Sequence, residues 1–160
     1  MIILRDGNLF NCPHNYSMAH CISADAKMSK GIALHFIDQF PEIASLRKTT
    51  NLVGTAVAVN VGGRTVYNLV TKQRFWMKPS LQSIRDCLLS MLSHALANGI
   101  NDICIPKLGS GCDKLDFNND VMPLLKCVFG DQVINIHVYC YRYVISVSAL
   151  LLCKVVEFVL

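Results

Sequence analysis

Short apolar runs alternate with stretches of helical periodicity along this chain, and that alternation predicts an α/β domain. The apolar runs have the length of buried strands and end at turn-forming residues. We expect single strands over residues 1–4, 16–22, 101–106 and 133–140. Two β-branched runs, 55–61 and 65–71, flank the pair Gly62-Gly63, and this pattern is typical of a β-hairpin.

Three segments place apolar residues at helical spacing and predict the helices of the domain. We expect them over residues 31–40, 79–98 and 119–129, with a further helical turn over 41–48. Asn98-Gly99 ends the longest helix in the usual C-cap manner. Asp120 is the expected N-cap of the last helix. Neither an internal repeat nor a linker interrupts the pattern, so we interpret residues 1–140 as one domain.

Composition narrows the class of protein. Hydrophobic residues make up 52% of the 160 residues and charged ones only 16%, which excludes intrinsic disorder. The formal net charge of +4 only weakly favours an anionic partner, and the basic residues of the protein are dispersed along the chain. Binding of nucleic acid through a basic patch therefore ranks low, although it stays open at this point.

The cysteines and histidines favour free side chains over a metal site. None of the 8 cysteines forms a C-x-x-C pair, and the 5 histidines form no H-x-x-x-H pair, so we expect no metal. Free thiols point to a reducing compartment, and we expect an intracellular protein of the cytoplasm, the nucleus or both. His20 and His137 lie inside apolar strands and are expected in the core.

Much of the hydrophobicity lies at the C-terminus, in residues 141–160. This segment carries three charged residues, Arg142, Lys154 and Glu157. From Val144 onward only 17 residues remain, which is the short limit of the roughly 17–25 needed to span a bilayer. We therefore favour an apolar helix or strand packed on the domain or on a partner over insertion into a membrane.

Two loops are candidates for binding an anion. The loop 106–113 follows a buried strand and contains Gly109 and Gly111, which let a backbone approach a phosphate; a tight turn with no ligand explains them as well. The full G-x-G-x-x-G and P-loop patterns are absent. The stretch 23–31 leads into a helix N-terminus, which attracts anions; the alternative is an ordinary helix start capped by Ser29.

Lys72 and Asp113 are candidates for chemistry. Lys72 ends an apolar strand and is either a solvated charge or, when partly buried, an amine nucleophile. Asp113 is either a turn former or an acid–base group. Phe75 and Trp76 follow the lysine. Three interpretations stay open for them: a wall of a pocket, packing in the core, or a patch that faces a membrane.

Five segments, in this order, resemble the macrodomain family and, more narrowly, its terminal ADP-ribose protein glycohydrolase branch. They are 7–10 (GNLF), 19–23 (AHCIS), 28–33 (MSKGIA), 69–72 (LVTK) and 106–113 (PKLGSGCD). The resemblance runs from about Ile2 to Tyr139 and implies a three-layer α/β/α sandwich with a mixed, mostly parallel central sheet. Residues 141–160 form a hydrophobic C-terminal extension outside it.

The resemblance also implies a cleft that binds ADP-ribose. It places Asn8 and Leu9 at the adenine, and Ser23 at the distal ribose. The two loops around the diphosphate and distal ribose are then Ser29, Lys30, Gly31 and Ile32, and Gly109, Ser110, Gly111 and Cys112. Two positions depart from the family pattern. Asn8 is neutral where the family has an acid, which weakens the bond to the adenine amino group, and Ser29-Lys30 replaces a smaller pair.

The activity that the resemblance implies uses a lysine as nucleophile. Lys72 would attack the anomeric carbon of the distal ribose, and Asp113 would help to resolve the lysyl–ADP-ribose intermediate. The implied substrates are ADP-ribosyl esters of glutamate or aspartate in proteins and O-acetyl-ADP-ribose, without a metal or other cofactor. ADP-ribosylated nucleic acid is a further substrate class of the branch. The alternative is a non-catalytic module that only binds ADP-ribose, which would need neither Lys72 nor Asp113.

Overall fold

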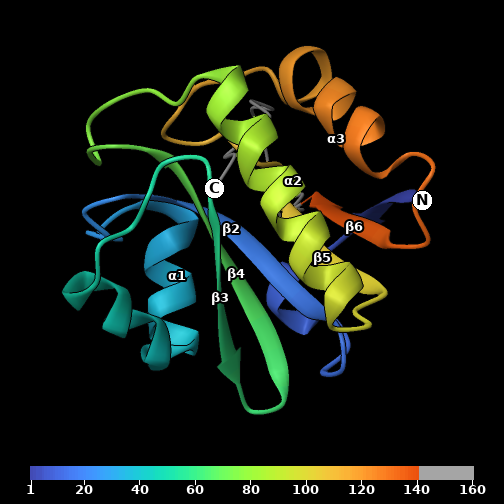
Figure 1. Ribbon diagram of the computed structural model, residues 1–160, viewed down its shortest axis with the longest axis horizontal. Helices are drawn as coiled ribbons and strands as arrows, with labels where there is room; N and C mark the ends of the chain where they lie inside the picture. The colour runs from blue at the N-terminus through green and yellow to red at the C-terminus, as the bar shows by residue number, and fades with distance from the viewer. Residues whose placement is uncertain (141–160) are drawn as a thin grey trace, which may run out of the picture.

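The strands form one six-stranded sheet in the order β1-β6-β5-β2-β4-β3 within residues 1–140, the part of the chain that the computed structural model describes (Figure 1). Neighbouring strands are parallel except β3 and β4, which form the antiparallel hairpin. The strands are β1 (Ile2–Asp6), β2 (Ser17–Ser23), β3 (Ala56–Val61), β4 (Arg64–Lys72), β5 (Asp102–Pro106) and β6 (Asn135–Cys140). The sheet is thus mixed and mostly parallel, as predicted.

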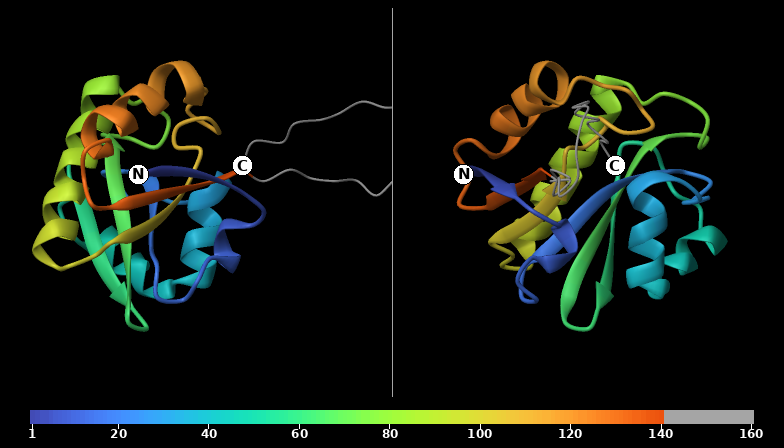
Figure 2. Two further views of the ribbon diagram at one scale, coloured as in Figure 1. Left: turned by 90° about the vertical axis from the view of Figure 1, so that its right-hand side faces the viewer. Right: turned by 180° about the vertical axis from the view of Figure 1, so that it is seen from behind.

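Helices cover both faces of this sheet, so that the fold has three layers (Figure 2). Helices α2 and α3 pack on one face, and α1 with the short helices η1 and η2 packs on the other. Their bounds are η1 (Leu9–Asn11), α1 (Gly31–Gln39), η2 (Pro41–Lys48), α2 (Leu81–Ala97), η3 (Phe117–Val121) and α3 (Met122–Phe129). The expected α/β/α sandwich is confirmed.

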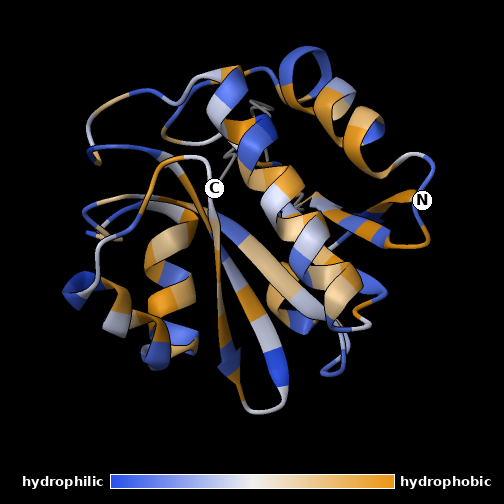
Figure 3. Ribbon diagram, in the orientation of Figure 1, coloured by the Kyte–Doolittle hydropathy of each residue, from blue (hydrophilic) through white to orange (hydrophobic). Residues whose placement is uncertain are grey.

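Two hydrophobic clusters hold the layers together, one on each face of the sheet. Side chains of a strand point alternately to the two faces, and β4 shows the consequence. Tyr67 and Leu69 are buried under α2, whereas Val66 and Val70 are buried under α1 and η2. Hydrophobic residues accordingly run through the strands and alternate with polar ones along α2 and α3 (Figure 3).

The boundaries of two helices differ from the sequence-based expectation. Asp120 is not the N-cap of the last helix, since the N-cap of α3 is Val121 and makes no side-chain capping bond. Asp116 caps the preceding turn η3, accepting from the amides of Asn118 and Asn119 at 3.0 and 3.1 Å. The chain enters α3 through the π-helical turn η3, which moves the start of helical structure towards the N-terminus. Ser29 does not cap α1 either, because the N-cap is Lys30 and makes no side-chain capping bond.

The proposed C-terminal extension, residues 141–160, lies outside the described residues. The prediction that it packs on the domain or on a partner therefore stays a prediction. Within residues 1–140, none of the helices is long and apolar enough to cross a membrane.

His20 links the sheet to α1 and gives a first prediction, on stability. It is fully buried in β2, stacks on Phe36 with ring centroids 4.0 Å apart, and its Nε2 bonds Asn68 Oδ1 at 2.8 Å. Burial lowers the pKa of His20 from 6.5 to about 4, although the bond to Asn68 opposes this. Below about pH 6.5 the unfolded chain therefore takes up a proton that the folded protein excludes until about pH 4.

We expect the free energy of unfolding to fall by roughly 3 kcal/mol on account of His20 as the pH drops through this range. Urea unfolding at pH 7.0 and at about pH 4.5 measures the change, and a His20→Gln variant, whose amide can bond Asn68, isolates it. The variant should lose less stability than the wild type. Equal pH dependence of the two proteins would refute the assignment.

Candidate active site

A cavity of about 280 Å³ opens at the carboxyl ends of β2, β4 and β5. In a parallel sheet these ends meet at one edge, where ligands of α/β proteins bind. Most of the residues singled out from the sequence line it. They are Ser23, Ser29, Lys30, Gly31, Ile32, Lys72, Gly109, Gly111, Cys112 and Asp113, together with Phe75.

Three of the expected binding residues lie outside the lining of this cavity. The Asn8 side chain accepts from the Phe10 amide at 3.0 Å and so caps its own turn. Leu9 is buried in the core beside α1. Ser110 donates its hydroxyl to the Lys107 carbonyl at 2.6 Å, within its own loop.

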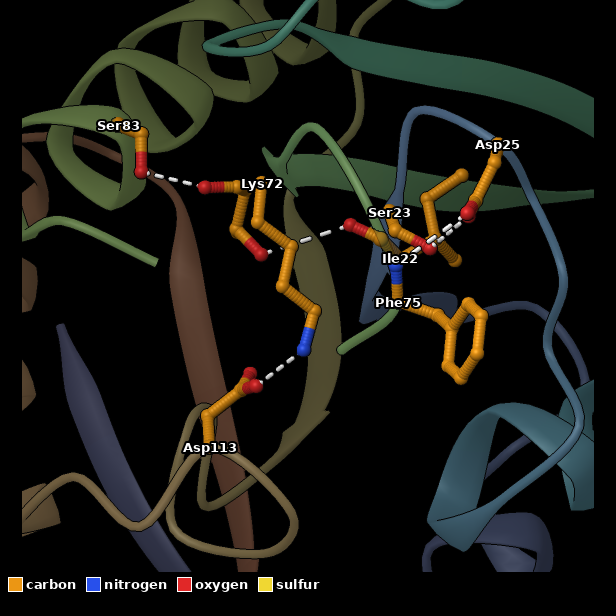
Figure 4. A network of polar contacts seen from close by, with 8 residues as sticks. Ile22, Ser23, Asp25, Lys72, Phe75, Ser83 and Asp113 are labelled. Carbon is orange, nitrogen blue, oxygen red and sulfur yellow. Dashed lines mark hydrogen bonds and ion pairs between the residues drawn. The ribbon is translucent and has the colours of Figure 1, made fainter. Parts of the chain in front are cut away.

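Lys72 and Asp113 meet inside the cavity, although they are far apart in the sequence (Figure 4). The Lys72 ammonium donates to Asp113 Oδ1, and the two side chains are only 11% and 10% exposed. The pair is therefore shielded from most of the solvent. This burial makes the electrostatic interaction between the two charges stronger than it would be at the surface. The interpretation of Lys72 as a solvated surface charge is wrong.

The backbone around Lys72 is fixed from both sides. Its carbonyl accepts from the Ala24 amide at 2.8 Å, across the irregular pairing of β2 and β4 at Ile22 and Ser23. The preceding carbonyl, of Thr71, accepts from the Ser83 hydroxyl of α2 at 2.6 Å (Figure 4). Ser83 is not among the residues predicted from the sequence, although a polar residue on the buried face of an amphipathic helix is a signal for such a role.

Asp25 joins the segment after β2 to the turn after β4, and nothing in the sequence pattern singles it out. Its carboxylate accepts from the Ser23 hydroxyl and, at 3.3 Å, from the Phe75 amide (Figure 4). Burial alone would raise the pKa of Asp25, but the hydrogen bonds from Ser23, Phe75 and Lys27 outweigh it and lower that pKa. Asp25 therefore holds Ser23 and Phe75 in fixed positions as a charged group.

The N-terminus of α1 faces the cavity with Gly31, Ile32 and Ala33. Since no side chain caps this helix, its first amides are available to an anion, and the helix dipole favours negative charge there. A Cβ on Gly31 would come within 3.3 Å of Cys112 Sγ, so the two loops nearly touch. Together they form the polar wall expected of an anion site.

The thiol of Cys21 is not poised to react as a thiolate. Cys21 lines the cavity, and burial, followed by the negative charge of Asp113, raises the pKa of its thiol far above the ordinary range. Cys21 is therefore a neutral thiol, and the Lys72 amine is the stronger candidate nucleophile. All seven cysteines within residues 1–140 are free.

Potential metal ligands do not gather in threes anywhere in the described part of the chain. His20 and His137 are both buried, as expected of core residues. His137 bonds Asp102 at 2.8 Å and so joins β6 to β5 away from the cavity.

The chain is similar to characterised proteins along most of its length, although no protein-family model matches it. It is 38% identical over 133 residues to the ADP-ribose glycohydrolase OARD1 of cattle and of human, covering 83% of this chain and 87% of each relative. Among solved structures, the macrodomain of Mycobacterium tuberculosis DarG superposes with a TM-score of 0.78 at 22% identity, covering 87% of this chain and 97% of that one.

A further solved structure contains a ligand. Thermosipho africanus DarTG in complex with ADP-ribose superposes with a TM-score of 0.73 at 18% identity, covering 86% of this chain and 41% of the larger one. At these identities the two structural comparisons establish the fold.

Proposed function

This chain belongs to the macrodomain family, within its ADP-ribose glycohydrolases, and on that premise we propose that it cleaves ADP-ribosyl esters of glutamate and aspartate, and O-acetyl-ADP-ribose, with Lys72 as nucleophile. The enzyme is thus a hydrolase that reverses ADP-ribosylation. All proposed site residues lie between Asn8 and Asp113, so we take residues 1–140 as the functional domain. The free thiols support a reducing compartment, the cytoplasm or the nucleus.

The contact between Lys72 and Asp113 carries this proposal. Both side chains line the cavity, touch each other and are largely buried. Binding of ADP-ribose alone would require neither an amine nor a carboxylate at this place. Their pairing therefore favours an enzyme over a non-catalytic binding module.

In the first step, Asp113 accepts a proton from the Lys72 ammonium, because an ammonium has no lone pair with which to attack. The freed amine attacks the anomeric carbon of the distal ribose. A bond forms between Nζ and this carbon, and the bond from the carbon to the ester oxygen breaks. The acceptor leaves as a carboxylate with the bonding electron pair.

In the second step, water replaces the lysine. Asp113 first releases to the solvent the proton that it took from Lys72, and its carboxylate then takes a proton from the attacking water and passes it to the departing amine. The carbon–nitrogen bond breaks, ADP-ribose is released, and Lys72 and Asp113 recover their starting charges. The two steps require no group beyond the side chains and water.

The walls of the cavity support binding of the diphosphate and the distal ribose. The amides of α1 at Gly31 and Ile32, and those at Gly111 and Cys112, offer donors to the phosphates, and Lys30 adds positive charge. The Ser23 hydroxyl already donates to Asp25. It can therefore only accept a hydrogen bond from the ligand, which suits a ribose hydroxyl.

Gly109 provides a prediction on the second of these loops. It has a φ of +75°, and an added Cβ would come within 2.8 Å of the Leu115 side chain. We expect Gly109→Ala to lower stability by about 1–2 kcal/mol and to weaken ADP-ribose binding, because the loop must shift. Calorimetric titration with ADP-ribose measures the affinity.

Gly62→Ala is the matched control, because Gly62 also has a positive φ of +55° but has no atom within 4 Å of the added Cβ. It should lose stability and keep its affinity for ADP-ribose. If the two variants bind ADP-ribose equally, the loop at Gly109 does not hold the ligand.

The substrate class is tested with two ADP-ribosylated peptides. One carries ADP-ribose as an ester on glutamate, and the other carries it on serine. Because a carboxylate leaves far more readily than an alkoxide, the protein should release ADP-ribose from the first and little from the second. Binding of free ADP-ribose without release from the glutamate peptide would overturn the proposal.

A further inference from the structure

An exposed turn with two aromatic side chains follows Lys72 directly, and the mechanism above makes no use of it. Residues Arg74–Met77 form this turn, which we call the aromatic turn, and the Met77 amide closes it on the Arg74 carbonyl at 3.0 Å. Phe75 is 40% exposed and lines the cavity, whereas Trp76 is 73% exposed and lies outside the lining. A tryptophan that is this exposed adds little to the stability of the fold, but it is well suited to contact a binding partner.

The aromatic turn follows β4, so it lies next to the strand end at which Lys72 would attack. One proposed phosphate loop, with Ser29–Ile32, comes after β2, and the other, 106–113, comes after β5. Lys72 ends β4, which is the next strand along the sheet after β2. A nucleotide that extends from those loops to Lys72 presents its anomeric carbon there. The group attached to that carbon then lies towards the aromatic turn, where Phe75 stands beside Ser23 and Asp25 (Figure 4).

The surroundings of the aromatic turn are positively charged. The Lys27 ammonium lies 3.8 Å from the centroid of the Phe75 ring, in a cation–π contact. Arg74 belongs to the turn, and Lys78 follows it with an exposed side chain. Asp25, the acidic residue that contacts the turn, already accepts hydrogen bonds from Ser23 and Phe75. Its single negative charge also interacts with Arg74, so Lys27, Arg74 and Lys78 leave a surplus of positive charge around the turn.

We propose that the aromatic turn, with Lys27 and Lys78, docks the polypeptide segment that carries the ADP-ribosylated residue and prefers segments with further acidic side chains. This inference rests on the proposed function, because an ester acceptor is a carboxylate, which polypeptides supply and nucleic acids lack. The cations attract the acidic side chains, and Trp76 covers the apolar part of the segment.

The test compares two substrates that differ only beyond the anomeric carbon. O-acetyl-ADP-ribose has no peptide, whereas a glutamate-ADP-ribosylated acidic peptide reaches the aromatic turn. Trp76→Ala should raise the KM for the peptide about tenfold and leave the KM for O-acetyl-ADP-ribose within about twofold. Val133→Ala, at a site 76% exposed, is the matched control and should change neither.

The charge preference is tested with Lys78→Gln. This variant should narrow the difference in KM between acidic and neutral ADP-ribosylated peptides, most clearly at low salt, whereas Lys126→Gln on the exposed side of α3 should not. Equal effects of Trp76→Ala on both substrates would overturn the docking proposal. A defect confined to ADP-ribosylated DNA would overturn it too and assign the turn to nucleic acid.

Binding separates this proposal from the proposed function. In a Lys72→Ala background, which prevents turnover by the proposed route, the ADP-ribosylated acidic peptide should bind more tightly than free ADP-ribose, and Trp76→Ala should remove that difference. Absence of the difference would refute docking even if the enzyme is active. Presence of the difference without turnover in the wild type would refute the proposed reaction and leave docking in place.

Discussion

Replacing Lys72 by alanine should lower kcat for a glutamate-ADP-ribosylated peptide by about three orders of magnitude or more. The amine is the proposed nucleophile, and the thiol of Cys21, which lines the same cavity, is held neutral. The affinity for ADP-ribose should stay within a few fold, because the amides of the two loops remain. Release of ADP-ribose under single-turnover conditions, with calorimetric binding, measures both.

The control for this variant is Lys126→Ala, which removes an exposed lysine of α3. It should keep wild-type kcat and KM. Because Lys72→Ala leaves Asp113 without its partner, urea unfolding should accompany the assay to show that the variant is folded. A folded Lys72→Ala protein that keeps more than about a tenth of wild-type kcat would contradict the nucleophile assignment.

Replacing Asp113 by asparagine should lower kcat by about two to three orders of magnitude, because the amide cannot accept the proton of Lys72 or of water. Asparagine has nearly the size of aspartate, so the loop 106–113 and the binding of ADP-ribose should be preserved. Rapid-quench kinetics should show that breakdown of the intermediate is slowed, in addition to its formation.

Asp116→Asn is the matched control for this second variant. Asp116 lies three residues further on, and its side chain caps the turn into α3, a role that asparagine also fills. This variant should retain wild-type rates. Normal activity of Asp113→Asn would show that the carboxylate only neutralises Lys72.

Much of the fold could be predicted because apolar runs and helical spacing are local properties of the sequence. Every strand of the described residues, and the hairpin at Gly62-Gly63, was expected from such runs. Capping was harder to predict, because several polar residues compete for one helix start. Asp116 caps the turn into α3 where Asp120 was expected, and Lys30 stands at the start of α1 in place of Ser29.

The site could be predicted only in part from the residues themselves. Lys72 and Asp113 were ambiguous as single residues, since the parallel order of β5, β2 and β4 brings them together and no local pattern encodes that order. The resemblance to macrodomains supplied the missing link. It did not reveal Asp25 or Ser83, whose roles depend on hydrogen bonds between elements.

The two proposed phosphate loops show the same limit. The glycines of the second loop were compatible with a simple turn until the structure placed them on the cavity with the start of α1. Asn8, Leu9 and Ser110 were expected at the ligand, but Asn8 and Ser110 bond within their own segments and Leu9 packs in the hydrophobic core.

The covalent intermediate on Lys72 is the central claim, and its most direct test is mass spectrometry of the reacting protein. Asp113→Asn is mixed with a glutamate-ADP-ribosylated peptide, quenched during turnover and digested, and the modified residue is located. We predict one ADP-ribosyl group on Lys72 and none on Lys107, which also lines the cavity. Turnover of the peptide without any adduct on Lys72, or with the adduct on another residue, would contradict the account.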